Sequence, residues 1–388
     1  MPAATSSLID AAREIAPLAR RHADESERDR RLAPPVVAAL RDAGLFRMLV
    51  PRELGGAEAT VAALVGAIET VAAGDGAAGW CLMIAATTGI TAALLPPEGA
   101  REIHGDPGSI TGGMLMPRGT ARRVEGGYRV TGRWAYGSGS PHCTWLLGGV
   151  TVVDESGAPE TLPGGHPHLR MAFFRAGDYV IHDTWHVSGL RGTGSHDYEV
   201  ADLFVPERHT AGIGGVQPWP EGPLYRFPMY GLLALGVAAV GLGIARAAID
   251  ELVSLAGAKT PTGSRRVLAE RAAAQAGIAE AEALLRSSRA LLADAIGSAW
   301  AAAERGEVLS LDDRAGLRLA ATHAARSCTR AVDICYDLGG GTSIYEASPL
   351  QRHFRDIHTL TQHVMVGLPT YEVVGRIMLG LPTDTFML

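Results

Sequence analysis

Residues 128–136, Tyr-Arg-Val-Thr-Gly-Arg-Trp-Ala-Tyr, alternate between apolar and polar side chains. Such alternation is typical of a β-strand with one buried face. Apolar or β-branched stretches of similar texture, punctuated by turns, occupy residues 145–153, 171–174, 179–181 and 198–205. Together they predict an all-β segment of roughly 100 residues, which Val205-Pro206 closes.

The sequence on both sides of this segment has the texture of helices. Near the N-terminus, apolar residues spaced for one helix face are Ile9, Ala12, Ile15, Leu18 and Ala19. Beyond the β segment, residues 231–245 are uncharged and largely apolar, and Ala-rich stretches follow at 265–305 and 312–338. This order predicts a mainly α protein with a β insert. We expect a helical domain at 1–107, a β domain at 108–210 and a helical bundle domain at 211–388.

Composition and charge exclude several classes of protein. Thirty-five basic and 41 acidic residues give a net charge of −6, so the chain lacks the basic footprint of a nucleic-acid binder. The uncharged stretch 231–245 is shorter than the ~20 residues of a membrane span and predicts a buried helix. Four cysteines in 388 residues make no disulfide framework. We therefore expect a cytoplasmic protein without a membrane anchor.

Two glycine-rich stretches have the chemistry to contact a phosphate. Residues 189–195 read Gly-Leu-Arg-Gly-Thr-Gly-Ser, and residues 339–343 read Gly-Gly-Gly-Thr-Ser. Neither is a P-loop, because no Gly-Lys-Ser/Thr follows. Their backbone N–H groups and hydroxyls suit a pyrophosphate or a ribose, although such a stretch alone is more often a turn.

The loop at 134–142 joins two predicted strands and carries small, hydroxyl-bearing residues. It is suited to approach a flat ring, with Trp134 or Trp145 as an aromatic wall. The alternative is an ordinary Gly/Ser hairpin loop.

Three histidines, His353, His358 and His363, are spaced by five residues. Steps of five on a helix rotate by about 140°, so the three side chains point in different directions. We expect no metal site.

Several motifs, taken in chain order, resemble those of the acyl-CoA dehydrogenase superfamily. They are residues 51–56 (Pro-Arg-Glu-Leu-Gly-Gly), Trp134 with Ser138-Gly139, residues 204–206 (Phe-Val-Pro), 339–341 (Gly-Gly-Gly) and 352–356 (Arg-His-Phe-Arg-Asp). The resemblance covers nearly the whole chain. It implies an N-terminal helical domain, a middle β-barrel domain and a C-terminal four-helix bundle. It also implies a flavin between the β domain and the bundle, and a homotetramer in which a neighbour supplies the loop at Gly339, Gly340 and Gly341.

Two chemistries are open within that superfamily. A dehydrogenase needs a carboxylate base, which many members carry about nine residues beyond the arginine of the Arg-Asp pair. Counting from Arg355 reaches Val364, and residues 357–369 contain no acid. The pattern Trp134, Ser138-Gly139, His142 and Trp145 instead resembles the two-component flavin monooxygenases. So do residues 189–195 and the pair Arg355-Asp356 followed by His363.

This second resemblance implies an enzyme that receives reduced FMN or FAD from a separate NAD(P)H:flavin reductase. O2 then adds at flavin C4a, and one oxygen atom passes to an organic substrate, aromatic or heteroaromatic in our expectation. Ser138 is implied to hydrogen-bond near flavin N5, and His363 to face the substrate or the peroxide. The residues expected to contact the flavin are Trp134, Ser138, Gly139, Arg191, Thr193, Ser195, Gly339, Gly340 and Gly341.

The alternatives are an acyl-CoA dehydrogenase or flavin oxidase with its base elsewhere, and a non-catalytic binding subunit. The choices between FMN and FAD, between carbon and nitrogen or sulfur oxygenation, and between dimer and tetramer stay open at this point.

Overall fold

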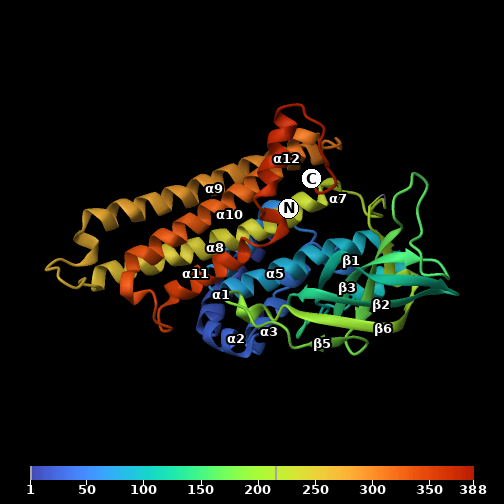
Figure 1. The fold of residues 1–388 in the computed structure, drawn as a ribbon, viewed down its shortest axis with the longest axis horizontal. Helices are drawn as coiled ribbons and strands as arrows, with labels where there is room; N and C mark the ends of the chain where they lie inside the picture. The colour runs from blue at the N-terminus through green and yellow to red at the C-terminus, as the bar shows by residue number, and fades with distance from the viewer. Residues whose placement is uncertain (1, 215) are drawn as a thin grey trace.

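The protein, described for residues 2–214 and 216–388 of a computed structural model, begins with a helical part (Figure 1). Its longer helices are α1 (Pro2–Arg21), α2 (Ala23–Asp29), α3 (Pro34–Asp42), α4 (Val61–Ala72), α5 (Gly76–Thr88) and α6 (Pro97–His104). Side-chain caps fix two of the helix starts. Thr60 accepts a hydrogen bond from the N–H of Ala63, and Asp75 accepts one from the N–H of Ala78.

The middle part is a seven-stranded sheet, which confirms the predicted β insert. Its strands are β1 (Thr111–Val124), β2 (Gly127–Gly137), β3 (Trp145–Val153), β4 (Leu169–Arg175), β5 (Val180–His182), β6 (His196–Pro206) and β7 (Thr210–Gly212). The strand order is β5-β6-β2-β1-β3-β4-β7, with β1 and β3 parallel and the other pairs antiparallel. The quoted stretch 128–136 lies within β2, beside β1 and β6.

The C-terminal part is a helical bundle that extends away from the sheet (Figure 1). Its helices are α7 (Pro223–Arg226), α8 (Met229–Ala258), α9 (Ala272–Glu304), α10 (Leu311–Gly339), α11 (Pro349–Leu360) and α12 (Pro369–Met378). Ser310 and Asp313 form a capping box at the start of α10. The helices α8, α9, α10 and α11 lie side by side along the long axis of the molecule.

In the part of the chain that the structure describes, two helical segments are long and apolar enough to cross a membrane, namely Gly76–Leu94 and Met229–Ala258. Both are core segments here, because 83% of the apolar window of the first and 89% of that of the second are buried within the protein. The expectation that residues 231–245 form a buried helix is therefore confirmed.

Glycines on α8 let the bundle approach the N-terminal helices closely. A side-chain carbon at Gly243 would overlap the backbone of Glu69 in α4, and one at Gly236 would lie 2.8 Å from Cγ of Met83 in α5. This contact fixes α5 between the bundle and the sheet. The helical, β and helical parts follow the expected order, while their division into three domains at residues 107 and 210 stays a prediction.

Candidate active site

A chain of buried hydroxyl groups joins α5 to two loops of the sheet. The indole Nε1 of Trp80 in α5 donates to Oγ of Ser138, 3.0 Å away, in the loop after β2. Oγ of Ser138 lies 2.7 Å from Oγ of Ser195, which lies 2.6 Å from Oγ1 of Thr193. The Thr193 hydroxyl donates to the carbonyl of Leu190 over 2.8 Å. These contacts bring together Ser138, Thr193 and Ser195, three residues expected at the flavin.

The two loops that carry these hydroxyls are held together by backbone contacts. Gly139 adopts a positive φ of 74°, which costs a glycine little, and its N–H donates to the carbonyl of Thr193 over 2.9 Å. Oγ of Ser140 donates to the carbonyl of Gly194 over 3.2 Å. Gly139 therefore belongs to the same site, as a turn residue that positions Ser138.

The short helical turn η4 (Arg191–Thr193) is anchored to the bundle through Asp356 of α11. Oδ1 of Asp356 accepts a 2.6 Å hydrogen bond from the N–H of Leu190. A side chain at Gly189 would overlap the carbonyl of Arg355, so the loop reaches α11 only because this residue is glycine. Burial raises the pKa of Asp356 to about 7, and its hydrogen bond links α11 to the 189–195 loop.

Glu27 and three arginines lie near the hydrogen bond between Asp356 and Leu190. The carboxylate of Glu27 in α2 lies 2.6 Å from Arg355 and 2.9 Å from Arg352. Burial opposes ionisation of Glu27, but hydrogen bonds and the charges of Arg355 and Arg352 lower its pKa overall. The guanidinium of Arg191 lies 3.7 Å from Glu27 at the more exposed edge of the network. Arg191 is thus placed beside the hydroxyl chain, although it makes no described hydrogen bond to it.

His363 also contacts Trp80. Their ring centroids are 5.5 Å apart and the rings meet edge to face. Nδ1 of His363 accepts a 3.3 Å hydrogen bond from the N–H of Met365, so the ring proton sits on Nε2. Burial, and then the positive charge of Arg318, lower the pKa of His363 to about 4. At neutral pH this histidine is therefore an uncharged hydrogen-bond donor at Nε2.

Trp80 is the site residue that sequence reasoning missed. It touches both of the predicted catalytic residues, Ser138 and His363, and its side chain is 7% exposed. A signal was present, because Trp80 is the one large aromatic residue in a helix of small and aliphatic side chains that follows the Asp75 cap.

Trp134, in contrast, lies in the core of the sheet and is 0% exposed. Its Nε1 donates to the carbonyl of Gly149, and its ring stacks on Tyr198 at 5.4 Å. Glycines on three strands make room for it, since a side-chain carbon at Gly119, Gly132 or Gly148 would lie 2.5–2.7 Å from its ring atoms. We therefore assign Trp134 to the core and leave it out of the proposed flavin contacts.

Gly339, Gly340 and Gly341 lie at the end of α10 that points away from the sheet (Figure 1). Helix geometry of about 1.5 Å per residue puts them about 40 Å along the bundle from the start of α10. There Nζ of Lys259 donates to Oγ1 of Thr342 over 2.8 Å. A cavity of about 520 Å³ is lined by Lys259, Arg271, Thr342 and Tyr345, together with Gly340 and Gly341.

His358 and His142, two further histidines considered from the sequence, make separate contacts. His358 pairs with Asp333 at 2.9 Å between α11 and α10, and His142 stacks on Phe46 at 5.9 Å between ring centroids. Within residues 2–214 and 216–388, no group of three or more His, Cys, Asp or Glu side chains could hold a metal ion.

Comparison with known proteins identifies two family matches in the chain. Residues 9–102 match the acyl-CoA dehydrogenase N-terminal domain family, and residues 235–367 match the acyl-CoA dehydrogenase C-terminal domain family. The chain is 36% identical over 378 residues to indole-3-acetate monooxygenase of Pseudomonas putida, covering 97% of this chain and 93% of that protein. It is 28% identical to the oxygenase component of an FADH2-dependent resorcinol hydroxylase of a Rhizobium species, covering 95% and 92%.

Solved structures agree with the sequence comparison. The chain superposes on XiaF of a Streptomyces species, solved with FADH2 and glycerol, with a TM-score of 0.90, 26% identity and coverage of 97% and 96%. It superposes equally well on the 3-HSA hydroxylase of Rhodococcus sp. RHA1, with 26% identity and coverage of 98% and 99%. With the helical, β and helical order and the hydroxyl site in place, the chain belongs to the flavin-dependent monooxygenases of the acyl-CoA dehydrogenase superfamily.

Proposed function

We propose that this chain is the oxygenase component of a two-component system that oxygenates an aromatic or heteroaromatic small molecule. A separate NAD(P)H:flavin reductase supplies reduced FMN or FAD, and O2 is the second substrate. One oxygen atom enters the product and the other leaves as water, while the flavin returns to its oxidised form. The names of the relatives support this proposal, since they include an oxygenase component and enzymes named for indole-3-acetate and resorcinol.

One structural observation carries the choice of an oxygenase over a dehydrogenase. Ser138 and His363 both contact Trp80, and no described hydrogen bond or ion pair in residues 2–214 and 216–388 joins either of them to a carboxylate. A dehydrogenase needs a carboxylate to remove a proton from its substrate. The buried carboxylates Asp75 and Asp356 instead accept hydrogen bonds from the backbone N–H groups of Ala78 and Leu190.

The residues at this site fit a flavin ring. Ser138 is a buried hydroxyl with a free acceptor position, and Nε of Arg191 is buried without a described partner. When bound, the reduced flavin supplies two electrons and the reaction with oxygen. Ser138 holds the hydrogen at flavin N5, Gly139 positions Ser138, and Thr193 and Ser195 support it. Arg191 offers positive charge at the edge of the site.

His363 binds and orients the substrate by donating a hydrogen bond from Nε2. Trp80 and the apolar residues of α5 keep water away from the same region, which protects the oxygen transfer from side reactions. Ser138 and His363 therefore have different roles: Ser138 contacts the flavin, and His363 contacts the substrate.

We further propose a homotetramer in which Gly339, Gly340 and Gly341 contact a flavin bound by a neighbouring subunit. Lys259 and Arg271 line the adjoining cavity and provide the positive charge that a flavin phosphate requires. Ile344 and Tyr345, next to this loop, are each 67% exposed in the single chain, which supports an interface here. We propose a cytoplasmic location, where a flavin reductase and NAD(P)H are present.

The experiment mixes the purified chain with FMN or FAD reduced under anaerobic conditions, and then adds oxygen and one test substrate at a time. Indole-3-acetate, resorcinol and unsubstituted indole form the first panel. We expect one atom of ¹⁸O from ¹⁸O2 in the product of at least one aromatic compound. Reduction of protein-bound oxidised flavin by an acyl-CoA, without oxygenated product from a wider aromatic panel, would support the dehydrogenase instead.

A further inference from the structure

We propose that the carbonyl of Leu190, acting through Thr193 and Ser195, fixes the direction of the Ser138 hydroxyl so that the site selects reduced flavin over oxidised flavin. This inference rests on the proposed function, because it takes Ser138 to lie against flavin N5. It adds a specificity determinant made of residues that need not touch the flavin themselves.

The direction of the hydroxyl chain follows from counting protons. The Leu190 carbonyl can only accept, so the single hydroxyl proton of Thr193 is used there. Thr193 must then accept from Ser195, 2.6 Å away. Ser195 has in turn used its only proton, so it accepts from Ser138 over 2.7 Å. Each hydroxyl donates toward Leu190, and the proton of Ser138 points away from the flavin side.

Ser138 is therefore an acceptor toward all its other neighbours. One lone pair of its oxygen accepts from Nε1 of Trp80 over 3.0 Å. The second lone pair is available to another donor. Reduced flavin carries a hydrogen on N5 and satisfies it, whereas oxidised flavin presents only a lone pair at N5.

Oxidised flavin could be accommodated only at a cost. If the Ser138 proton turned toward N5, the 2.7 Å contact with Ser195 would place two lone pairs face to face. If the Ser138 proton did not turn, a lone pair of the Ser138 oxygen would face the lone pair of N5 in oxidised flavin. An unsatisfied buried polar contact of this kind corresponds to roughly a tenfold to hundredfold loss of affinity.

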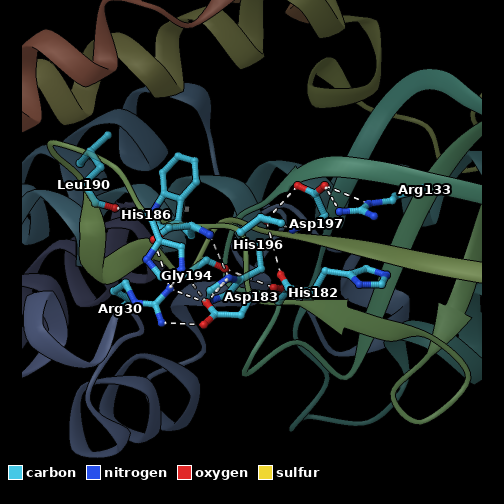
Figure 2. A network of polar contacts seen from close by, with 12 residues as sticks. Arg30, Arg133, His182, Asp183, His186, Leu190, Gly194, His196 and Asp197 are labelled. Atoms are coloured by element: carbon cyan, nitrogen blue, oxygen red, sulfur yellow. Dashed lines mark hydrogen bonds and ion pairs between the residues drawn. The ribbon is translucent and has the colours of Figure 1, made fainter.

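The Leu190 carbonyl is held firmly enough to impose this direction. It also accepts from the N–H of Thr193 at 3.1 Å and from Nε1 of Trp185 at 3.1 Å. The N–H of Trp185 in turn donates to Nδ1 of His196 over 3.2 Å. Figure 2 shows Leu190 together with the adjoining polar network, in which Asp183 lies between Arg30 and the histidines His186 and His196. Asp356 also accepts from the N–H of Leu190, so both peptide groups that flank this residue are hydrogen-bonded.

The test compares the dissociation constants of oxidised and reduced flavin in wild type and variants. Oxidised flavin is titrated by its fluorescence, and reduced flavin is titrated anaerobically. Ser195→Ala removes the acceptor of the Ser138 proton, and Thr193→Val lets Ser195 donate back to Ser138. Both variants free the Ser138 proton for N5. We expect oxidised flavin to bind more tightly in both variants. The ratio, defined as the dissociation constant of oxidised flavin divided by that of reduced flavin, should therefore fall roughly tenfold or more.

Two controls separate this effect from general damage. Trp80→Phe removes a donor to Ser138 without changing the proton direction, so both affinities fall and the ratio stays. Thr329→Val removes a buried threonine hydroxyl that donates to the carbonyl of Ala325 within α10, and it should change neither constant. The midpoint potential of the bound flavin gives a second readout, since a tenfold fall in the ratio lowers it by about 30 mV.

The outcomes are distinct. A wild-type ratio near one, or an unchanged ratio in both Ser195→Ala and Thr193→Val, would overturn the inference while leaving the oxygenase proposal intact. Failure of wild type to bind either form of FMN or FAD would instead overturn the proposed function. If both variants lose reduced flavin and gain no oxidised flavin, the hydroxyls act only as packing, and the inference is also wrong.

Discussion

Replacing His363 with glutamine and with leucine tests whether this residue works as a hydrogen-bond donor or as a base. Nδ1 is occupied by the N–H of Met365, and the pKa of about 4 leaves roughly one molecule in a thousand protonated at pH 7. The proton on Nε2 is therefore available for donation. A glutamine can place an amide N–H in a similar position, whereas a leucine of similar bulk cannot.

The size of the expected effect differs between the two roles. A lost hydrogen bond to a polar or charged substrate group costs about 1–3 kcal/mol, which corresponds to roughly 5- to 150-fold in product formation. A lost general base costs roughly 10² to 10⁴-fold. We expect His363→Leu to fall in the first range and His363→Gln to retain most of the wild-type product yield.

The assay measures oxygen consumed, product formed and hydrogen peroxide released in the same reaction. Oxygen consumption should continue in His363→Leu, because the reaction of reduced flavin with oxygen does not need this side chain, and peroxide should replace the missing product. The yield of product per oxygen should also be flat between pH 6 and 8, since a group with a pKa of about 4 does not titrate there. Thermal unfolding of each variant controls for the lost contact with Met365.

Several results would refute this reasoning. His363→Gln as inactive as His363→Leu, with a 10³-fold loss, would make His363 a base. Unchanged coupling in His363→Leu would show that another histidine acts, and His358 and His142 would be examined next.

Three further predictions can be checked with the same protein. Light scattering should give a homotetramer, because we place the loop at Gly339–Gly341 against a neighbour's flavin, and a monomer at working concentration would contradict the shared site. The chain should purify with little bound flavin, since the site favours the reduced form; a stoichiometric, tightly held yellow cofactor would argue against it. Stability should fall on acidification, because His104 is 1% exposed and burial lowers its pKa to about 3. The contribution of the buried, neutral His104 to the free energy of unfolding is complete above the unfolded pKa of about 6.5. This contribution is lost as the pH falls, by about 2 kcal/mol between pH 7 and pH 5. Chemical unfolding of wild type and His104→Leu at both pH values measures this difference, and an equal pH dependence in the two proteins would contradict it.

The layout of the fold could be predicted from sequence because burial patterns are local. Alternation at 128–136 marks a strand, and the unbroken apolar run at 231–245 marks a helix surrounded by protein. Side-chain direction was harder to predict. β2 carries shifts of register against β6 between Val130 and Gly132 and between Trp134 and Gly137, so the facing of Trp134 does not follow from alternation. The glycines at 119, 132 and 148 were the signal that a large ring packs against the strands, but they are spread over β1, β2 and β3.

The site itself depends on contacts between residues distant in sequence. Ser138 and His363 were predicted from motifs, yet Trp80, which touches both, lies 58 residues from Ser138. Helix α5 gave no periodic pattern to identify an inward face, because nearly all of it is buried. The proton direction in the hydroxyl chain likewise cannot be read from residue types, since a serine donates or accepts equally well until its neighbours are known.

The Arg355-Asp356 pair shows how a motif can mark a site without carrying chemistry. Asp356 is separated by 166 residues from the Leu190 N–H that it binds, and no described contact joins it to Ser138 or His363. Its carboxylate accepts from the N–H of Leu190, the residue whose carbonyl accepts from the Thr193 hydroxyl. Because Asp356 belongs to α11, the direction of a hydroxyl in the sheet loops depends on correct packing of the bundle. The variant Asp356→Asn keeps the size of the side chain but weakens its hydrogen bond to the N–H of Leu190. It should therefore lower the preference for reduced over oxidised flavin more than it lowers the affinity for reduced flavin.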